Sequence, residues 1–171
     1  MTFDKLFNFC PVCGSDEFVV NNCKSKRCLV CGFIYYVNPS AATAAFIVNN
    51  NDELLVCRRA NEPAKNTLDL PGGFADTDET AEECISREIK EELGVEPSAV
   101  RYLFSQPNEY LYSGLTEPTL DMFFEAKLHA YSEIQAADDV AETFFVPKKD
   151  VKPEEFGLKS VRKAVEIFLK M

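Results

Sequence analysis

The chain has 171 residues, 46% of them hydrophobic, with a formal net charge of −10 and a pI near 4.6. This length suits one ordinary globular domain with one small module, and it excludes a large two-domain enzyme. The acidic charge excludes a general attraction to nucleic acid or to an anionic membrane, and the strongly apolar stretches are too short to cross a bilayer.

The N-terminal residues carry an acid and a base among apolar residues, without the apolar core and cleavage site of a signal peptide. A cytoplasmic location is therefore expected. In that reducing compartment the seven cysteines are expected to remain free of disulfides, which makes metal binding the main question about them.

The pattern Cys-x-x-Cys-Gly occurs twice, at residues 10–14 and 28–32, and is the chain's one internal repeat. Two thiolates three residues apart can face one ion, and the glycine that follows tolerates a tight turn. This spacing is typical of a zinc ribbon, and buried cysteines paired by coincidence are the alternative. The sequence thus predicts a structural zinc site in a module of residues 1–37, with the ligands Cys10, Cys13, Cys28 and Cys31. The remaining cysteines, Cys23, Cys57 and Cys84, are expected to be packing residues.

Residues 38–171 have the pattern of a single α/β domain. Two strands are expected on either side of an Asn-rich turn at residues 49–52, because Asn and Asp tolerate left-handed backbone geometry. An amphipathic helix is expected near the C-terminus, where apolar residues recur at helical spacing. The segment 106–118, which contains two prolines and a glycine, is predicted to be a loop. The expected strands are residues 41–48, 53–59, 100–105, 120–128 and 143–146.

The most informative segment is an acidic helix, predicted from Ala81 to Leu93. Thr80 followed by Glu83 is the signature of a capping box, and Gly94 follows the last turn as a stop signal. The sequence therefore defines both ends of this helix.

Three glutamates of this helix, Glu88, Glu91 and Glu92, fall within an arc of about 100° beside its apolar stripe. Mutual repulsion and partial loss of hydration disfavour this arrangement unless a cation neutralises it. Hard divalent cations such as Mg²⁺ bind such carboxylates readily, especially together with substrate phosphates. The glycines of the preceding segment Leu70-Pro71-Gly72-Gly73 let backbone carbonyls approach an ion closely. The alternative is an ordinary solvated acidic face.

The run of restricted positions across residues 73–95 resembles the Nudix box without a departure. The preceding Leu-Pro-Gly-Gly segment resembles the lead-in common in that family, although Leu68 stands where many members carry tryptophan. A four-cysteine ribbon that ends in Tyr-x-Asn-Pro and leads into this box resembles the NADH pyrophosphatase branch and related ADP-ribose or FAD pyrophosphatases. The matching positions of the box are Gly73, Glu79, Arg87, Glu88, Ile89, Glu91, Glu92, Gly94 and Val95.

The resemblance implies an α/β Nudix fold, a mixed sheet sandwiched between helices, and metal-dependent hydrolysis of a pyrophosphate linkage. In that chemistry water attacks one phosphorus, and metal ions held by carboxylates offset the charge that accumulates on the phosphoryl oxygens. The implied cofactor is Mg²⁺ or Mn²⁺, beside the structural Zn²⁺ of the ribbon. The implied metal ligands are Glu88 and Glu92, with Glu91 and the carbonyl of Gly73.

The resemblance also implies roles for the other residues of the box. Arg87 is expected to orient a glutamate by pairing with it, and Glu79 to hold the loop and the helix together. Members of the family take the general base either from the box or from a distant loop. The candidates here are Glu91 or Glu88 in the box, with Glu109 and Glu142 as loop candidates.

The implied substrate is a small-molecule nucleotide, a nucleoside diphosphate derivative such as ADP-ribose, NADH or FAD, cleaved to AMP and a phosphorylated product. Ser105-Gln106-Pro107 matches the start of the SQPWPFP motif of the NADH pyrophosphatase branch, and the departure after it weakens the case for NADH. Gln106, Tyr110 and Tyr112 are candidate substrate contacts, where the tyrosines either stack on a base or pack on the protein's own surface.

Other functions remain as alternatives. They are a nucleoside triphosphate pyrophosphohydrolase, a non-catalytic nucleotide sensor, and a ribbon that binds nucleic acid. The intact box argues against the sensor, and the few basic residues of the ribbon argue against nucleic-acid binding. A homodimer, common among relatives, is left open.

Overall fold

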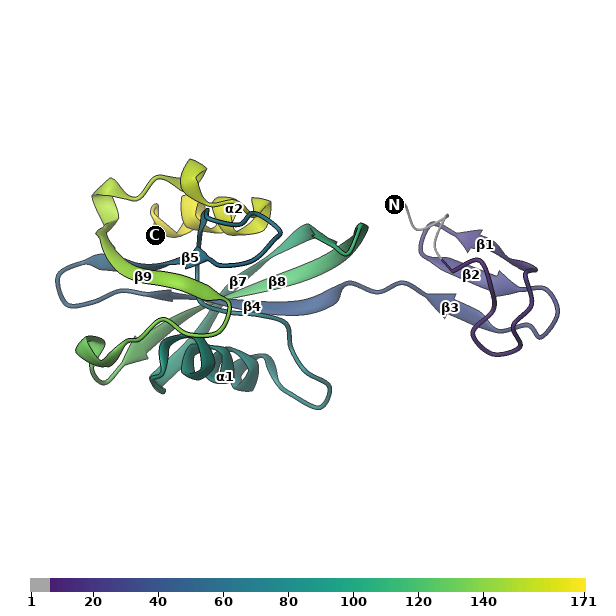
Figure 1. The fold of residues 1–171 in the computed structure, drawn as a ribbon, viewed down its shortest axis with the longest axis horizontal. Helices are drawn as coiled ribbons and strands as arrows, with labels where there is room; N and C mark the ends of the chain where they lie inside the picture. The colour runs from purple at the N-terminus through teal and green to yellow at the C-terminus, as the bar shows by residue number, and fades with distance from the viewer. Residues whose placement is uncertain (1–6) are drawn as a thin grey trace. The chain divides into compact units, whose positions relative to one another are not determined.

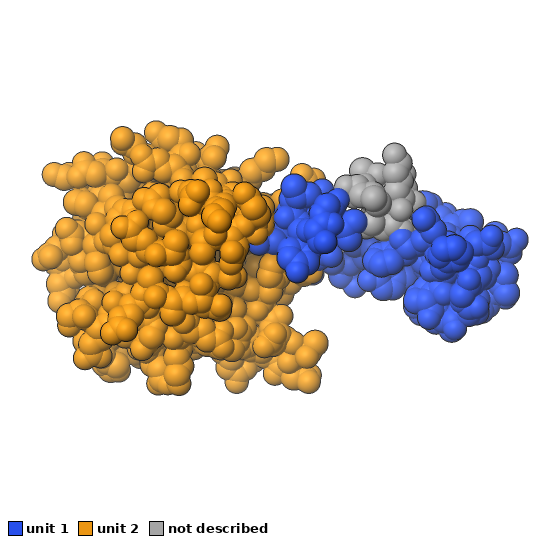
Figure 2. Space-filling model, in the orientation of Figure 1, with its two compact units in different colours: residues 1–39, 110–118 blue, residues 40–109, 119–171 orange. Residues whose placement is uncertain are grey.

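The computed structural model describes residues 7–171. The chain divides into two compact units, coloured separately in Figure 2. The first contains the residues up to Pro39 together with Tyr110–Pro118, and the second contains Ser40–Glu109 and Thr119–Met171. Each unit has hydrophobic core residues of its own. No helix within residues 7–171 is long and apolar enough to span a membrane.

The first unit contains a small antiparallel sheet and two turns of the same kind. Gly14 and Gly32 have φ angles of 74° and 77°, a left-handed geometry that favours glycine. Their N–H groups donate to the carbonyls of Cys10 and Cys28 at 2.9 and 3.0 Å, so the two Cys-x-x-Cys-Gly turns match. Cys23 is exposed, and its prediction as a packing residue is wrong because it lies in the turn between the first two strands. The strands are β1 (Phe18–Asn22), β2 (Ser25–Cys28) and β3 (Ile34–Tyr36), in the order β1-β2-β3.

The second unit contains two three-stranded sheets, one with a parallel pair. The orders are β4-β8-β7 and β6-β5-β9. Strands β4 and β8 pair in parallel, whereas β5 pairs antiparallel with both β6 and β9. The strands are β4 (Ser40–Ile47), β5 (Glu53–Arg59), β6 (Leu68–Asp69), β7 (Pro97–Tyr112), β8 (Leu115–Leu128) and β9 (Val140–Pro147).

Side chains alternate along the strands between two hydrophobic cores, one on each face of the sheets. Ala44 and Phe46 of β4 belong to the core that includes helix α2 (Lys159–Phe168). Ala45 and Ile47 belong to the core that includes helix α1 (Ala81–Leu93). Figure 1 shows α1 and α2 on opposite sides of the strands. This arrangement confirms the predicted mixed sheet between helices.

Helix α1 has the predicted ends. The Thr80 side chain accepts from the N–H of Glu83, the Glu83 side chain accepts from the N–H of Thr80, and Gly94 ends the helix with φ 71°. Three short 3₁₀ helices complete the unit: η2 (Tyr131–Glu133), η3 (Lys148–Asp150) and η4 (Pro153–Glu155).

The prediction that residues 106–118 form a loop is wrong. Strand β7 continues to Tyr112 and β8 begins at Leu115, with only Ser113 and Gly114 between them, both at positive φ. The prolines suggested a loop, but β7 is an edge strand, where Pro107 is tolerated. Pro118 precedes the first residue of β8 that pairs with β4, so it too is tolerated in a strand.

We expect Thr80→Ala to destabilise the second unit by about 1 kcal/mol, because it removes the hydroxyl that caps α1. Chemical denaturation of this variant, compared with Ser86→Ala in the middle of the same helix, measures the effect. Equal stability of wild type and Thr80→Ala would show that the capping box contributes nothing.

Candidate functional site

The acidic face of α1 is positioned by the packing of its apolar stripe. Ile85, Ile89 and Leu93 are fully buried in the core beneath the helix. Glu92 is next to this stripe and is only 7% exposed, whereas Glu91 points to solvent. The same helix therefore presents carboxylates at different depths.

Arg87 is the centre of the hydrogen bonds among these carboxylates. Its Nη1 donates to Glu88 at 2.8 Å and to Glu91 at 2.9 Å, and its Nε and Nη2 donate to the two oxygens of Glu79 at 2.9 and 3.0 Å. Nη2 also donates to the carbonyl of Phe74 at 3.1 Å. One guanidinium thus ties the helix to the segment before it.

The electrostatics of the pair between Arg87 and Glu79 follow from these bonds. The guanidinium of Arg87 lowers the pKa of Glu79 to about 2, with a smaller contribution from the N–H of Asp76. The hydrogen bonds to Glu79, Glu88 and Glu91 in turn raise the pKa of Arg87. Glu79 is therefore an anion at any physiological pH, and Arg87 a cation.

Glu92 is in the opposite situation, because no cation pairs with it in the described contacts. Its Oε2 accepts a hydrogen bond from the N–H of Gly72 at 2.9 Å. Burial raises the pKa of Glu92 to about 8 despite that bond, and the charges of Glu88, Asp69 and Asp139 contribute in the same direction. Burial likewise raises the pKa of Glu88.

The two glycines before the helix are required by close contacts. A Cβ atom on Gly73 would lie 2.4 Å from Oε1 of Glu88, and one on Gly72 would lie 2.1 Å from the carbonyl oxygen of Thr43. The N–H of Thr43 donates to the Gly73 carbonyl at 2.8 Å, which holds this segment against β4. The Cα of Gly73 therefore lies against the carboxylate of Glu88, while its carbonyl is bonded to β4.

Two aspartates that sequence reasoning missed lie near this face. Asp138 raises the pKa of Glu88 and Asp139 raises that of Glu92, as nearby negative charges do. A tertiary contact brings them there: the N–H groups of Gln135 and Ala137 donate to the last carbonyls of α1, at Leu93 and Glu92, which have no partners within the helix. The only sequence signal was two adjacent aspartates before β9.

The other predicted site residues lie elsewhere. Glu109 and Glu142 were predicted to lie in loops. This prediction is wrong, because Glu109 lies in strand β7 and Glu142 in strand β9. Glu142 forms an ion pair with Arg58 at 3.1 Å. Gln106 lies in β7, and Tyr110 and Tyr112 belong to the hairpin tip in the first unit, so their contact with substrate stays a prediction.

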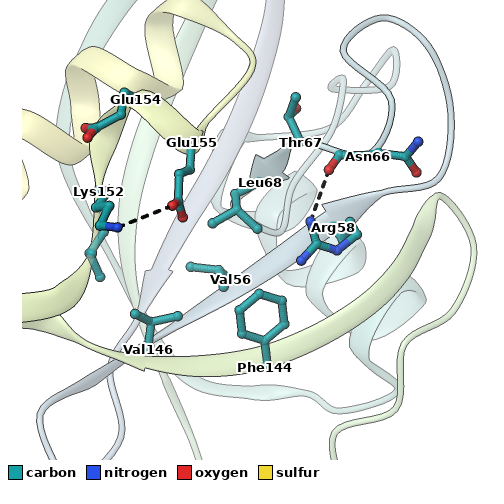
Figure 3. Close-up of a pocket in the computed structure, with 11 residues that line it drawn as sticks. Val56, Arg58, Asn66, Thr67, Leu68, Phe144, Val146, Lys152, Glu154 and Glu155 are labelled. Carbon is teal, nitrogen blue, oxygen red and sulfur yellow. Dashed lines mark hydrogen bonds and ion pairs between the residues drawn. The ribbon is translucent and has the colours of Figure 1, made fainter.

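Arg58 also borders a cavity of about 600 Å³, shown in Figure 3. Val56 and Leu68 line it and belong to the core beneath α2, so the cavity opens on the face of the sheet opposite α1. In Figure 3, Arg58 lies on one side of these apolar residues and Lys152 on the other. The cavity is therefore separate from the carboxylates of α1.

The four cysteines of the two turns form a cluster in the first unit. Their Sγ atoms all lie within 4.8 Å of one another. The contact between Cys10 and Cys31 is 3.7 Å and that between Cys13 and Cys28 is 3.6 Å. A tetrahedral zinc site with Zn–S bonds of 2.3 Å has S···S edges of about 3.8 Å, so the cluster fits zinc.

A sequence model of the NUDIX domain matches residues 38–165. The chain belongs to the NUDIX family. Among solved structures, the NUDIX hydrolase from Nitrosomonas europaea superposes with a TM-score of 0.72 at 20% identity, over 96% of this chain and 91% of that one. The second unit thus has the NUDIX fold.

Two curated relatives carry named activities. The NAD-capped RNA hydrolase NudC of Vibrio atlanticus is 32% identical over 99 residues, which cover 58% of this chain and 36% of that protein. The ADP-ribose pyrophosphatase of Methanocaldococcus jannaschii is 41% identical over 75 residues, which cover 43% of this chain and 44% of that protein. The chain thus spans between a third and a half of the length of these NUDIX relatives.

We expect a pH-dependent stability from Glu92 of the NUDIX box when the protein is free of Mg²⁺ and Mn²⁺. Its pKa is higher in the folded protein than in the unfolded chain, so its contribution to stability is complete below about pH 4 and is lost as the pH rises to about 8. Glu92→Gln should therefore be more stable than wild type at pH 9, by about 2 kcal/mol or more. Denaturant unfolding between pH 5 and pH 9 checks this, with Glu82→Gln as the control, and parallel profiles for wild type and Glu92→Gln would contradict it.

Metal analysis of protein purified without added zinc should find about one zinc per chain, held by four thiolates without an open position. Cys13→Ser should lose this zinc and destabilise the ribbon, whereas Cys23→Ser, at an exposed cysteine outside the cluster, should keep it. Full zinc occupancy in Cys13→Ser, or its loss in Cys23→Ser, would overturn the ligand set.

Proposed function

We propose that the protein is a metal-dependent hydrolase that cleaves the pyrophosphate linkage of a nucleoside diphosphate derivative of the ADP-ribose or NADH type, giving AMP and a phosphorylated product. The observation that carries the proposal is the set of carboxylates on α1, held by Arg87 on one side and by the N–H of Gly72 on the other. These oxygen donors suit a hard divalent cation and no soft one.

The donors for such a cation are Glu88 and Glu92, with Glu91 and the carbonyl of Gly73 completing the set. Mg²⁺ or Mn²⁺ bound there offsets negative charge on phosphoryl oxygens and lowers the pKa of a bound water. The closeness of Gly73 to Glu88 and the bond between Gly72 and Glu92 support this grouping. The raised pKa of Glu92 supports it too, because a buried carboxylate without a cation partner is costly.

Arg87 and Glu79 act on the carboxylates and not on the substrate. Arg87 fixes Glu88 and Glu91 by hydrogen bonds, and Glu79 fixes Arg87 from the loop side. The two residues thereby keep like charges at defined positions before a cation binds. Both are positioning residues in this proposal.

The general base is Glu91 or Glu88. Asp138 is the loop carboxylate that fits better than the sequence candidates, because its charge acts on Glu88 whereas Glu109 and Glu142 lie in strands. Asp138 is exposed and has φ 51°, so its turn presents the side chain without burying it. In this role it would take a proton from the attacking water.

The names of the relatives support the substrate class. One is an ADP-ribose pyrophosphatase and another acts on NAD-capped RNA, and both substrates contain a pyrophosphate that joins an adenosine to a second sugar. The net charge of −10 disfavours binding of a long RNA. We therefore propose small nucleotides as the preferred substrates and NAD-capped RNA as the second candidate. Structural Zn²⁺ at the four cysteines has no part in the chemistry.

Turnover of ADP-ribose, NADH, FAD, an NAD-capped RNA and the dNTPs with Mg²⁺ or Mn²⁺ tests the proposal. We expect the highest kcat/KM for one of the first three, with AMP among the products. Glu88→Gln and Glu92→Gln should each lower turnover by about 100-fold or more at saturating metal, because each removes a donor oxygen. Glu82→Gln, an exposed glutamate of the same helix, is the matched control.

Two outcomes would contradict the proposal. A kcat/KM for any dNTP above those for ADP-ribose, NADH and FAD would overturn the substrate class. Near-normal turnover by Glu88→Gln or Glu92→Gln at saturating Mg²⁺ would overturn the metal assignment.

A further inference from the structure

Arg59 and Asp69 form an ion pair in the interior of the second unit. Nη1 of Arg59 lies 2.5 Å from Oδ2 of Asp69, and the side chains are only 18% and 11% exposed. Nε of Arg59 also donates to the carbonyl of Pro63 at 2.7 Å, and Oδ1 of Asp69 accepts from the N–H of Leu70 at 2.9 Å. The NUDIX box does not include this pair.

The pair lies on the same face of the sheet as the carboxylates of α1. Asp69 is directly opposite Cys57 in the antiparallel pair of β5 and β6, and Cys57 is in the core beneath α1. Burial raises the pKa of Cys57, and the charges of Glu92 and Asp69 contribute in the same direction, so both carboxylates lie near this thiol. The ion pair with Asp69 places the guanidinium of Arg59 on that face as well.

Asp69 is also joined to Glu92 along the chain. The N–H of Leu70 bonds to the Asp69 side chain, and two residues later the N–H of Gly72 bonds to the Glu92 carboxylate. Asp69 is therefore three residues from the N–H that bonds to Glu92, and both carboxylates are buried, so the interaction between their charges is screened little by solvent.

We propose that the Arg59–Asp69 pair sets the affinity of the acidic site for its divalent cation, because Asp69 cancels the positive charge of Arg59 on the face of the sheet that holds the carboxylates of α1. This inference rests on the proposed function only in taking the carboxylates of α1 as the cation site. Arg59 and Asp69 are positioning residues, and neither contacts the cation.

The proposal requires that substitutions of Asp69 and of Arg59 change the affinity for the cation in opposite directions. Asp69→Asn leaves the positive charge of Arg59 uncompensated near Glu92, so the affinity for the cation falls. Arg59→Gln leaves the negative charge of Asp69, so the affinity rises. The double variant restores neutrality and returns the affinity to near the wild-type value. A pair with a purely structural role would weaken binding in both single variants.

The measurement is a titration of the full chain with Mn²⁺ alone, without substrate, followed by electron paramagnetic resonance at pH 8 and 0.1 M salt. We expect the dissociation constant to rise about three- to tenfold in Asp69→Asn and to fall by a similar factor in Arg59→Gln. Thermal unfolding of each variant shows whether it is folded, and Arg59→Lys, which keeps the charge, should bind Mn²⁺ as wild type does.

The matched controls are Arg58→Gln and Glu142→Gln. Each breaks the ion pair between Arg58 and Glu142, and Arg58 precedes Arg59 in β5 and lies on the opposite face of the sheet. Each should change the Mn²⁺ dissociation constant less than twofold. Equal affinities in wild type, Asp69→Asn and Arg59→Gln, or changes of the same sign in both, would overturn the inference. Failure of the wild type itself to bind Mn²⁺ would instead overturn the proposed function, so the two failures are distinguishable.

Discussion

The site depends on one guanidinium placed among carboxylates. Arg87 bonds to Glu79, Glu88 and Glu91 at once, and a single residue therefore fixes two glutamates of the helix to one of the loop. Without it, like charges on adjacent turns would spread apart in solvent. Arg87 compensates only part of this charge, because Glu92 is buried beyond its described contacts. The remaining negative charge is the feature that would attract a cation in the proposed function.

The fold supplies the supports that this arrangement needs. The apolar stripe of α1 buries Glu92 against the sheet, the bonds of Gly73 and Pro71 to β4 hold the preceding loop, and the segment before β9 bonds to the last carbonyls of the helix. The hydrogen bonds between the segment before β9 and the end of α1 place Asp138 and Asp139 near the carboxylates of the helix. The carboxylates of this face therefore come from two distant parts of the chain.

Local signals explain what could be predicted from the sequence. The ends of α1 followed from Thr80, Glu83 and Gly94, because caps are set by neighbouring residues. The cysteine cluster followed from spacing alone. The segment 106–118 was mispredicted because its prolines are tolerated at a strand edge that only the sheet order defines.

Features that depend on tertiary structure could not be predicted. Asp138 approaches Glu88 because a loop bonds to the end of α1 more than forty residues away in sequence. The Arg59–Asp69 pair depends on the register of β5 and β6, which places Asp69 opposite Cys57.

The central claim is that the carboxylates of α1 repel one another until a divalent cation binds. The most direct test is the thermal midpoint of the zinc-loaded protein at pH 8.5 as Mg²⁺ is raised, without substrate. A cation that binds only the folded state should raise the midpoint progressively with its concentration. The account predicts this rise in wild type and its absence in a variant with both Glu88→Gln and Glu92→Gln. A midpoint that is independent of Mg²⁺ in wild type, or an equal rise in the double variant, would contradict it.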